Sequence, residues 1–342
     1  MTRDINDVKR ETGKTPDPFD PRFADDATVV EPGNVVPIRP DAEVDDGSLP
    51  MKPVLNSAFK GMQERLARGG GLAGEAVGLT RIDDALDGWQ RGRFYVIGGR
   101  TGMGKSIVGL NVANRAAEKG LGVDFISLEM PVEEQAVRAL LCQSKVPAFR
   151  LKNNTVEARH WSAMTTSIND MIKWPWAWND KPGVTVEQIE KQIRRCKAKM
   201  AEEGQSLFMV VVDHIQKIRG SKGKDRRTEM VHITDMLKNI AKSENVCVVG
   251  LAQVNRGTET RGQKDRRPRV SELQESGSIE QEADAIMLLY REDYYRKERD
   301  DYDNILEVSM PKIRGGEPTF AKLRFTGECY RIDNLASGES ES

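Results

Sequence analysis

The sequence predicts an α/β domain with a mostly parallel, twisted β-sheet flanked by helices, and three observations lead to this prediction. From Val77 onward, short runs rich in β-branched and aromatic residues alternate with segments of helical periodicity. Several runs are apolar on both faces, which is typical of strands covered by helices on both sides of a parallel sheet. A glycine-rich segment, 99–106, joins one such strand to the following helix. Roughly 260 residues of this pattern have the size of one domain.

The individual elements follow from these periodicities. Strands are expected at 94–98, 123–128, 208–212, 246–251, 285–290, 306–310 and 322–325. Helices are expected at 105–119, 132–145, 185–203 and 228–243. Three alternating tryptophans, at 174, 176 and 178, would suit stacking on nucleic-acid bases. Their position before an Asn-Asp-Lys-Pro-Gly turn favours core packing in one more buried strand.

Composition excludes several classes of protein. The 342 residues carry 52 basic and 53 acidic side chains and are 38% hydrophobic, as expected of a soluble globular protein. No apolar run approaches the roughly 20 residues that span a bilayer, and the N-terminus lacks the apolar core of a signal peptide. The four cysteines form no CxxC pair, which argues against a zinc site and fits a reducing compartment. We therefore expect a cytoplasmic protein with no membrane partner.

Charge is unevenly distributed along the chain. Residues 1–50 contain twelve acidic and six basic residues and seven of the fifteen prolines, whereas the remainder carries 46 basic and 41 acidic residues. The first segment is expected to be disordered, either as a solvating tail or as an arm that binds a partner or mimics DNA. A second disordered tail is expected at 335–342, and the α/β domain at 76–334.

A helix and a glycine-rich connection are expected at 51–75, ahead of the domain. An apolar stripe recurs at spacings of four, three and four, on Leu55, Phe59, Met62 and Leu66. Three turns are marginal for an isolated helix in water, so this helix needs a surface on which to dock. Either its own domain or a neighbouring subunit would provide one.

The glycine-rich segment fits the phosphate-binding pattern GxxxxGK[ST] in the required position between a strand and a helix. Its glycines allow backbone N–H groups to point at phosphate oxygens, beside the positive end of the helix. Lys105 would reach the β- and γ-phosphates, and the Ser106 hydroxyl would ligate Mg²⁺. The residues expected to bind ATP are Gly99, Arg100, Thr101, Gly102, Met103, Gly104, Lys105 and Ser106.

Carboxylates stand at the ends of two other predicted strands. Asp213 ends the apolar run 208–212, where an acid orients Mg²⁺. The next residue is His214 instead of a second acid, so another base must polarise the attacking water. The candidate is Glu129, which follows the strand 123–128. That strand comes directly after the phosphate-loop helix, and we expect it to neighbour the phosphate-loop strand.

Taken together, the motifs resemble the RecA-like motor domain of DnaB-type replicative helicases. The resemblance covers roughly 76–334, in order and without a large gap. Its most specific stretch is ESGSIEQEAD at 275–284. The other matching stretches are 99–106, 127–131, 211–216, 251–256 and 312–316.

The resemblance implies an ATP-hydrolysing helicase that forms a hexameric ring and translocates on single-stranded DNA from 5′ to 3′. By this resemblance Glu129 is the catalytic base, Asp213 is the metal-orienting acid and Gln253 senses the γ-phosphate. Lys312 and Arg314 would form a basic pair on a β-hairpin that reaches the ATP of the next subunit, and strand alternation places both on one side. The residues that match the DNA-contacting loop are Gln274, Glu275 and Gly277.

The chain departs from the family pattern in several places. Gln274 replaces a frequent Arg, and His214 replaces a common Tyr; we interpret the histidine as a packing or supporting side chain, not as a metal ligand. The family's N-terminal collar domain, which engages primase, has no counterpart, as in a shortened version from a phage or other mobile replicon. Primase or a helicase loader are the further partners implied. Two basic clusters could supply DNA contacts: Arg219, Lys222, Lys224, Arg226 and Arg227, and Arg256, Arg261, Lys264, Arg266, Arg267 and Arg269.

Two other functions are compatible with parts of this pattern. A RecA- or RadA-like recombination or repair ATPase would share the core, but the SGSIEQ stretch at 276–281 and the pair Lys312 and Arg314 favour a helicase. A non-catalytic DnaB-like adaptor or decoy would bind a host helicase. The complete set of nucleotide-site residues argues against that role.

Overall fold

The fold is seen in a computed structural model that describes residues 49–67, 71–220, 225–255, 266–273, 276–296 and 303–336. Most of both predicted tails lies outside these residues. Among the helices described, none is long and apolar enough to cross a membrane.

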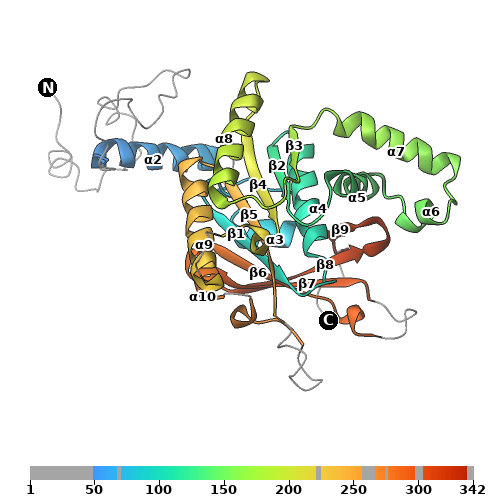
Figure 1. Ribbon diagram of the computed structural model, residues 1–342. Helices are drawn as coiled ribbons and strands as arrows, with labels where there is room; N and C mark the ends of the chain where they lie inside the picture. Colours follow the sequence, from blue (N-terminus) through green and yellow to red (C-terminus); the bar gives the residue numbers. More distant parts are fainter. Residues whose placement is uncertain are drawn as a thin grey trace, which may run out of the picture. The chain divides into compact units, whose positions relative to one another are not determined.

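In the described part of the chain, nine strands form one sheet in the order β3-β2-β4-β5-β1-β6-β7-β8-β9 (Figure 1). The six from β3 to β6 are parallel, and β7, β8 and β9 continue the sheet in antiparallel fashion. In chain order the strands are β1 Phe94–Gly99, β2 Gly122–Ser127, β3 Trp176–Asn179, β4 Leu207–Asp213, β5 Cys247–Gln253, β6 Ala285–Tyr290, β7 Ile305–Ile313, β8 Thr319–Thr326 and β9 Arg331–Asn334.

Helices cover both faces of the parallel strands. One core places α4 against alternate residues of β5 such as Leu251, and a second core places α8 and α9 against the opposite face, at Val210 and Val248. Figure 1 shows α4 and α9 on opposite sides of the sheet. The helices of the domain are α3 Thr80–Leu86, α4 Lys105–Glu118, α5 Val132–Ser144, α6 Ala148–Lys152, α7 Ala158–Met171, α8 Val186–Glu202, α9 Arg226–Ser243 and α10 Ser276–Glu282.

The register of the parallel strands aligns their carboxyl ends. Asp213 of β4 lies between Ser127 of β2 and Leu251 of β5, and Gly99 of β1 pairs with Gln253 of β5. All seven residues of β4 are buried, which confirms the prediction of a strand covered on both faces. The segments that follow these strands therefore gather at the carboxyl ends of the parallel strands, which we call the carboxyl edge of the sheet.

The prediction that β2 neighbours β1, the strand before the phosphate loop, was wrong. β2 lies beside β3 and β4, whereas β1 lies between β5 and β6. Adjacency along the chain does not set adjacency in a parallel sheet, because each connection crosses over through a helix. The strongly apolar β4 and β5 occupy the positions between β1 and β2.

Other elements were not predicted. α7 carries Trp161, Met164, Ile168 and Met171 at helical spacing, but its serines and threonines weaken the local helical signal. The antiparallel strand β9 is short and polar. The tryptophan segment does form a strand, β3, yet this strand is half-buried at the sheet edge, where Trp176 and Trp178 pack on Phe125.

The predicted helix ahead of the domain is α2, Met51–Ala67. Its apolar stripe is exposed, with Leu55, Phe59, Met62 and Leu66 more than half accessible to solvent. An exposed apolar stripe of this kind is typical of a helix that docks on a partner surface.

A buried carboxyl group interrupts the apolar face of β2. Asp124 is 2% exposed and accepts hydrogen bonds from Gln192 Nε2 of α8 at 3.2 and 3.4 Å. Burial raises the pKa of Asp124 to about 7, and the Gln192 hydrogen bond only partly offsets this. The folded state therefore binds a proton more tightly than the unfolded chain, whose aspartate titrates near its ordinary value.

We predict that Asp124→Asn stabilises the protein at high pH. The carboxyl's raised pKa lowers the free energy of unfolding as the pH rises from about 4 to 7, and the asparagine removes this loss. Urea unfolding should show a gain of roughly 2–4 kcal/mol at pH 8 that vanishes near pH 4. Asp235→Asn, on the exposed face of α9, is the matched control and should have no such effect. An equal gain at both pH values would contradict the explanation.

Candidate nucleotide-binding site

The phosphate loop lies between β1 and α4 in a conformation that needs glycine. Gly102 and Gly104 have φ values of +82° and +98°. A Cβ atom on Gly104 would lie 3.0 Å from Cε2 of the buried Phe325 ring. Gly104 is also the N-cap of α4, so the positive end of the helix and the backbone N–H groups face the loop. The loop has the chemistry of an anion cradle.

Two side chains at the start of α4 face this cradle. Lys105 Nζ donates to the carbonyl oxygen of Arg100 at 3.2 Å, and burial lowers the pKa of its ammonium group. The hydroxyl of Ser106 hydrogen-bonds to the carboxylate of Asp213. The motif residue and the strand-end acid are thus in direct contact, although they are far apart in the sequence.

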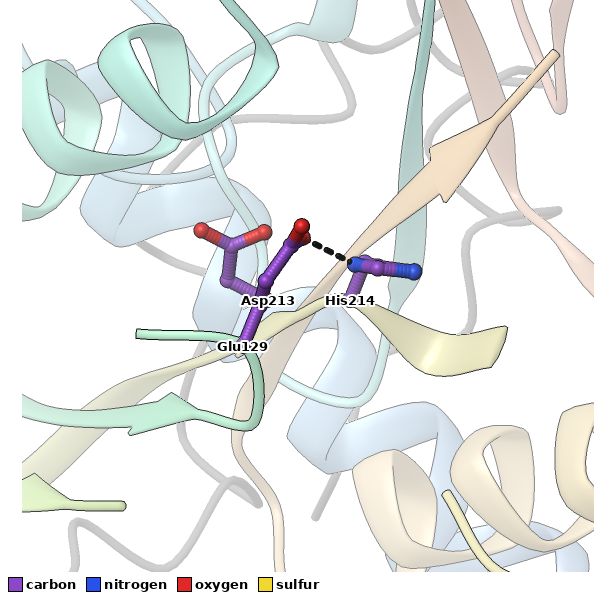
Figure 2. Close-up of side chains that lie close together, drawn as sticks. All are labelled: Glu129, Asp213 and His214. Atoms are coloured by element: carbon purple, nitrogen blue, oxygen red, sulfur yellow. Dashed lines mark ion pairs between the residues drawn. The ribbon is translucent and has the colours of Figure 1, made fainter. Parts of the chain in front are cut away.

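The ends of β2 and β4 bring three more polar groups together. Leu128 N donates to Asp213 O at 2.7 Å, which places Glu129 beside the aspartate. His214 Nδ1 lies 2.9 Å from Glu129 Oε2, and Figure 2 shows these two side chains pointing toward each other next to Asp213. Burial raises the pKa of Asp213, which the Ser106 hydrogen bond partly opposes, and burial lowers the pKa of His214.

Gln253, at the end of β5, contacts the phosphate loop directly. Its Nε2 donates to Thr101 Oγ1 at 3.2 Å, and the next residue's N–H donates to Gly99 O at 3.2 Å. Gln216 Oε1 accepts from the Gln253 backbone N–H at 3.2 Å and ties this strand end to the segment after β4. A change at the phosphate loop therefore has a short path to the segment that follows Gln253.

The oxygen ligands at this site fit Mg²⁺ and a nucleoside triphosphate. The Ser106 hydroxyl and the Asp213 carboxylate are hard oxygen ligands of the kind that Mg²⁺ prefers. Gln135, buried in α5, donates to Asp213 Oδ2 at 3.4 Å, and its own Oε1 is a buried acceptor without a partner among the described residues.

Lys312 and Arg314 lie toward the amino ends of the parallel strands, which we call the amino edge of the sheet. Lys312 Nζ donates to the carbonyl oxygens of Glu280 and Gln281, at the end of α10. Arg314 Nη1 lies 3.5 Å from Asp284 Oδ1, just before β6. The phosphate loop follows the far end of β1. Arg314 lies level with Phe94, about 17 Å of strand from that end, and Lys312 lies level with Val96, about 10 Å from it.

Asp284 binds several donors at the amino edge of the sheet. It accepts from Phe94 N at 2.8 Å and from Arg93 Nη1 at 3.0 Å, and it pairs with Lys238 of α9. Burial alone would raise its pKa, but the hydrogen bonds from these donors outweigh burial and hold the pKa below its usual value. The carboxylate therefore stays ionised as an anchor for Arg314.

The predicted DNA-contacting residues fall only partly within the structure. Gln274 and Glu275 lie outside the described residues, as do Lys222, Lys224, Arg256, Arg261 and Lys264. Gly277 is exposed in the first turn of α10 and lines a hollow together with Arg227 and Asn255. Of the described basic residues, Arg226 donates to Gln216 O at 2.7 Å and Arg267 pairs with Glu307 at 2.7 Å. These two arginines have structural partners within the chain.

Sequence reasoning missed residues that depend on distant pairings. The guanidinium of Arg291, just after β6, lies 3.7 Å from the centroid of the Phe325 ring, beside the phosphate loop. An arginine directly after the strand next to β1 was the available signal for Arg291. Nothing local marks Phe325 of β8, Gln135 or the pairing of His214 with Glu129.

Fold and site together define a RecA-like P-loop protein. The family described as DnaB-like helicase C terminal domain matches residues 74–334, and the chain belongs to this family. It is 34% identical over 288 residues to the replicative DNA helicase DnaC of Bacillus subtilis (strain 168) and 32% identical over 288 residues to DnaB of Geobacillus stearothermophilus. Each alignment covers 83% of this chain, and the chain spans 62% of the length of each relative.

Solved structures agree with this placement. The ATPase domain of G40P matches with a TM-score of 0.77 and 30% identity, over 85% of this chain and 100% of that one. A DnaB-like replicative helicase, described with its interactions with primase, matches with a TM-score of 0.74 and 30% identity, over 85% of this chain and 68% of that one.

We predict that Gly104→Ala weakens nucleotide binding by about tenfold, because a left-handed alanine costs roughly 1–2 kcal/mol and the new methyl group displaces the loop or Phe325. Titration with Mg²⁺-ATP measures the affinity. Gly120→Ala is the matched control, since Gly120 has a φ of +80° but no atom within 4 Å of an added Cβ. The control should lose stability and keep its nucleotide affinity. Equal affinities in both variants would rule out this account of the loop.

Proposed function

We propose that the chain is an ATP-dependent replicative DNA helicase that assembles as a hexameric ring and translocates on single-stranded DNA. The observation that carries the proposal is the gathering of Lys105, Ser106, Asp213, Glu129 and Gln253 at the carboxyl edge of one sheet. Membership of the DnaB-like family and similarity to replicative helicases support it. The ligands are ATP and Mg²⁺.

Each residue of the edge has a role in ATP hydrolysis. The loop N–H groups and Lys105 bind the phosphates, and Ser106 and Asp213 hold the metal. Bound Mg²⁺ supplies charge neutralisation on the phosphate oxygens. Glu129 accepts the proton of the attacking water. Gln253 senses the γ-phosphate and passes its loss to the segment after β5.

Lys312 and Arg314 act on the ATP of the neighbouring subunit. Their position toward the amino ends of the parallel strands, about 10 Å of strand from their own phosphate loop for Lys312 and about 17 Å for Arg314, supports action in trans. A guanidinium stabilises charge on the transferring phosphoryl group. Hydrolysis would then depend on how two subunits meet.

DNA contacts are assigned to the loop at Gln274, Glu275 and Gly277, where backbone N–H groups at the start of α10 suit phosphates. Movement of this loop after hydrolysis would carry a single strand through the ring, in the 5′ to 3′ direction by analogy with the family. Primase or a helicase loader are proposed further partners. The structural neighbour described with its interactions with primase supports the first.

Assembly is assigned to α2, whose exposed stripe would dock on a neighbouring subunit. The receptor we assign is an apolar hollow of about 400 Å³ between α5, α7 and β3, which includes Val137, Ile168 and Trp176. Ile172 at its rim is 74% exposed. Burial of both apolar surfaces would stabilise the ring.

We predict that Lys105→Ala abolishes ATP hydrolysis stimulated by single-stranded DNA, because the loop loses its phosphate-binding cation. Glu129→Gln should bind ATP with nearly unchanged affinity but turn it over at least a hundredfold more slowly, as expected for loss of a general base. Steady-state phosphate release and equilibrium binding of ATP separate the two defects. Unimpaired turnover by Lys105→Ala would overturn the proposed function.

We predict that Phe59→Asp prevents ring assembly, because a charge in the stripe cannot be buried against an apolar hollow. Ile172→Asp should have the same effect from the receptor side. Sedimentation with Mg²⁺-ATP should show smaller species for both variants. Ser57→Asp, on the opposite face of α2, should assemble normally, and a ring that tolerates Phe59→Asp would contradict this docking.

A further inference from the structure

We propose that His214 is a positioning residue that holds the carboxylate of Glu129 in the orientation for proton abstraction. The inference rests on the proposed ATPase function and extends it to a residue that has no catalytic role in that proposal. The close approach of His214 Nδ1 to Glu129 Oε2, at 2.9 Å, is the contact that carries it.

Glu129 by itself is poorly constrained. It follows β2 at the sheet edge, and 54% of its side chain is exposed. A glutamate in such a place loses considerable rotamer entropy when it is held in one orientation. A base must nevertheless keep its oxygen within hydrogen-bond reach of the water that it deprotonates. Another group has to restrict this carboxylate.

His214 is well suited to restrict it. Only 7% of its side chain is exposed, and its backbone carbonyl accepts from Lys217 N at 2.9 Å at the start of the turn after β4. The imidazole is therefore the buried member of the pair, and the more exposed Glu129 side chain points toward it (Figure 2). One oxygen of the carboxylate is bound by the ring. The other oxygen keeps its lone pairs for a water.

Through this contact the histidine acts on Glu129 and touches no reacting atom itself.

A metal-ligand role fits the geometry less well. Ligand atoms of Glu129, Asp213 and His214 lie within 4.8 Å of one another, as in a metal site. However, Nδ1 already serves Glu129, and Asp213 already contacts Ser106 of the phosphate loop. The histidine thus supports the base, and the aspartate belongs to the phosphate site.

The test compares three replacements in the full chain. His214→Leu fills space without a donor, and His214→Asn places an amide N–H near the position of Nδ1. His214→Gln places its amide near Nε2 and serves in place of the leucine variant should that one not fold. The matched control is His232→Leu, which removes the other described histidine–glutamate pair, with Glu187 at 2.9 Å, away from the site.

His214→Leu should lower kcat for DNA-stimulated ATP hydrolysis by about tenfold to a hundredfold, with the KM for ATP within twofold of the original. His214→Asn should recover kcat to within about threefold, because it restores the donor. His232→Leu should leave both constants unchanged. In the Glu129→Gln background, His214→Leu should cause no further loss, since the histidine acts through the glutamate.

Three results would overturn the inference while the parent protein remains an active ATPase. These are an unchanged kcat in His214→Leu, an asparagine variant as slow as the leucine variant, and an additive loss on the Glu129→Gln background. An inactive parent chain, or full activity in Lys105→Ala, would instead overturn the proposed function itself.

Discussion

The parallel register of β1, β2, β4 and β5 is the constraint on which the site depends. It sets Asp213 beside Ser127 and Gly99 beside Gln253, so segments far apart in the sequence end at one edge. Side-chain contacts complete the arrangement: Ser106 meets Asp213, Gln253 meets Thr101, and His214 meets Glu129. A slip of one residue in β4 would turn Asp213 to the opposite face and separate it from Ser106.

The opposite edge of the same sheet has a second organising group. Asp284 anchors Arg314 and joins β1, α9 and the start of β6. Lys312 contacts the last carbonyls of α10, whose first turn follows the proposed DNA loop. A rigid sheet thus carries a nucleotide site on one edge and a basic pair on the other, which is the arrangement that a ring of identical subunits requires to complete each site between neighbours.

Motifs and apolar runs made of consecutive residues made part of this structure predictable. The phosphate loop is encoded in eight consecutive residues, and Asp213 and Gln253 follow apolar runs that are recognisable as strands. The order of strands was not predictable, because crossover helices separate chain neighbours, and β2 was therefore placed wrongly beside β1. The His214–Glu129 contact follows from the true neighbours, β2 and β4. Phe325 comes from β8, more than 200 residues after the loop it covers, and only the folded sheet brings it there.

Subunit complementation tests the central claim that one edge of each sheet serves the site on the next subunit. Lys105→Ala and Arg314→Ala rings should each be inactive, the first for lack of a phosphate-binding cation and the second for lack of the trans-acting guanidinium. Mixed before assembly, the two variants should regain ATP hydrolysis, because a Lys105→Ala subunit supplies Arg314 to an intact phosphate loop. A mixture as inactive as its parents, or an Arg314→Ala ring with full activity, would contradict the account.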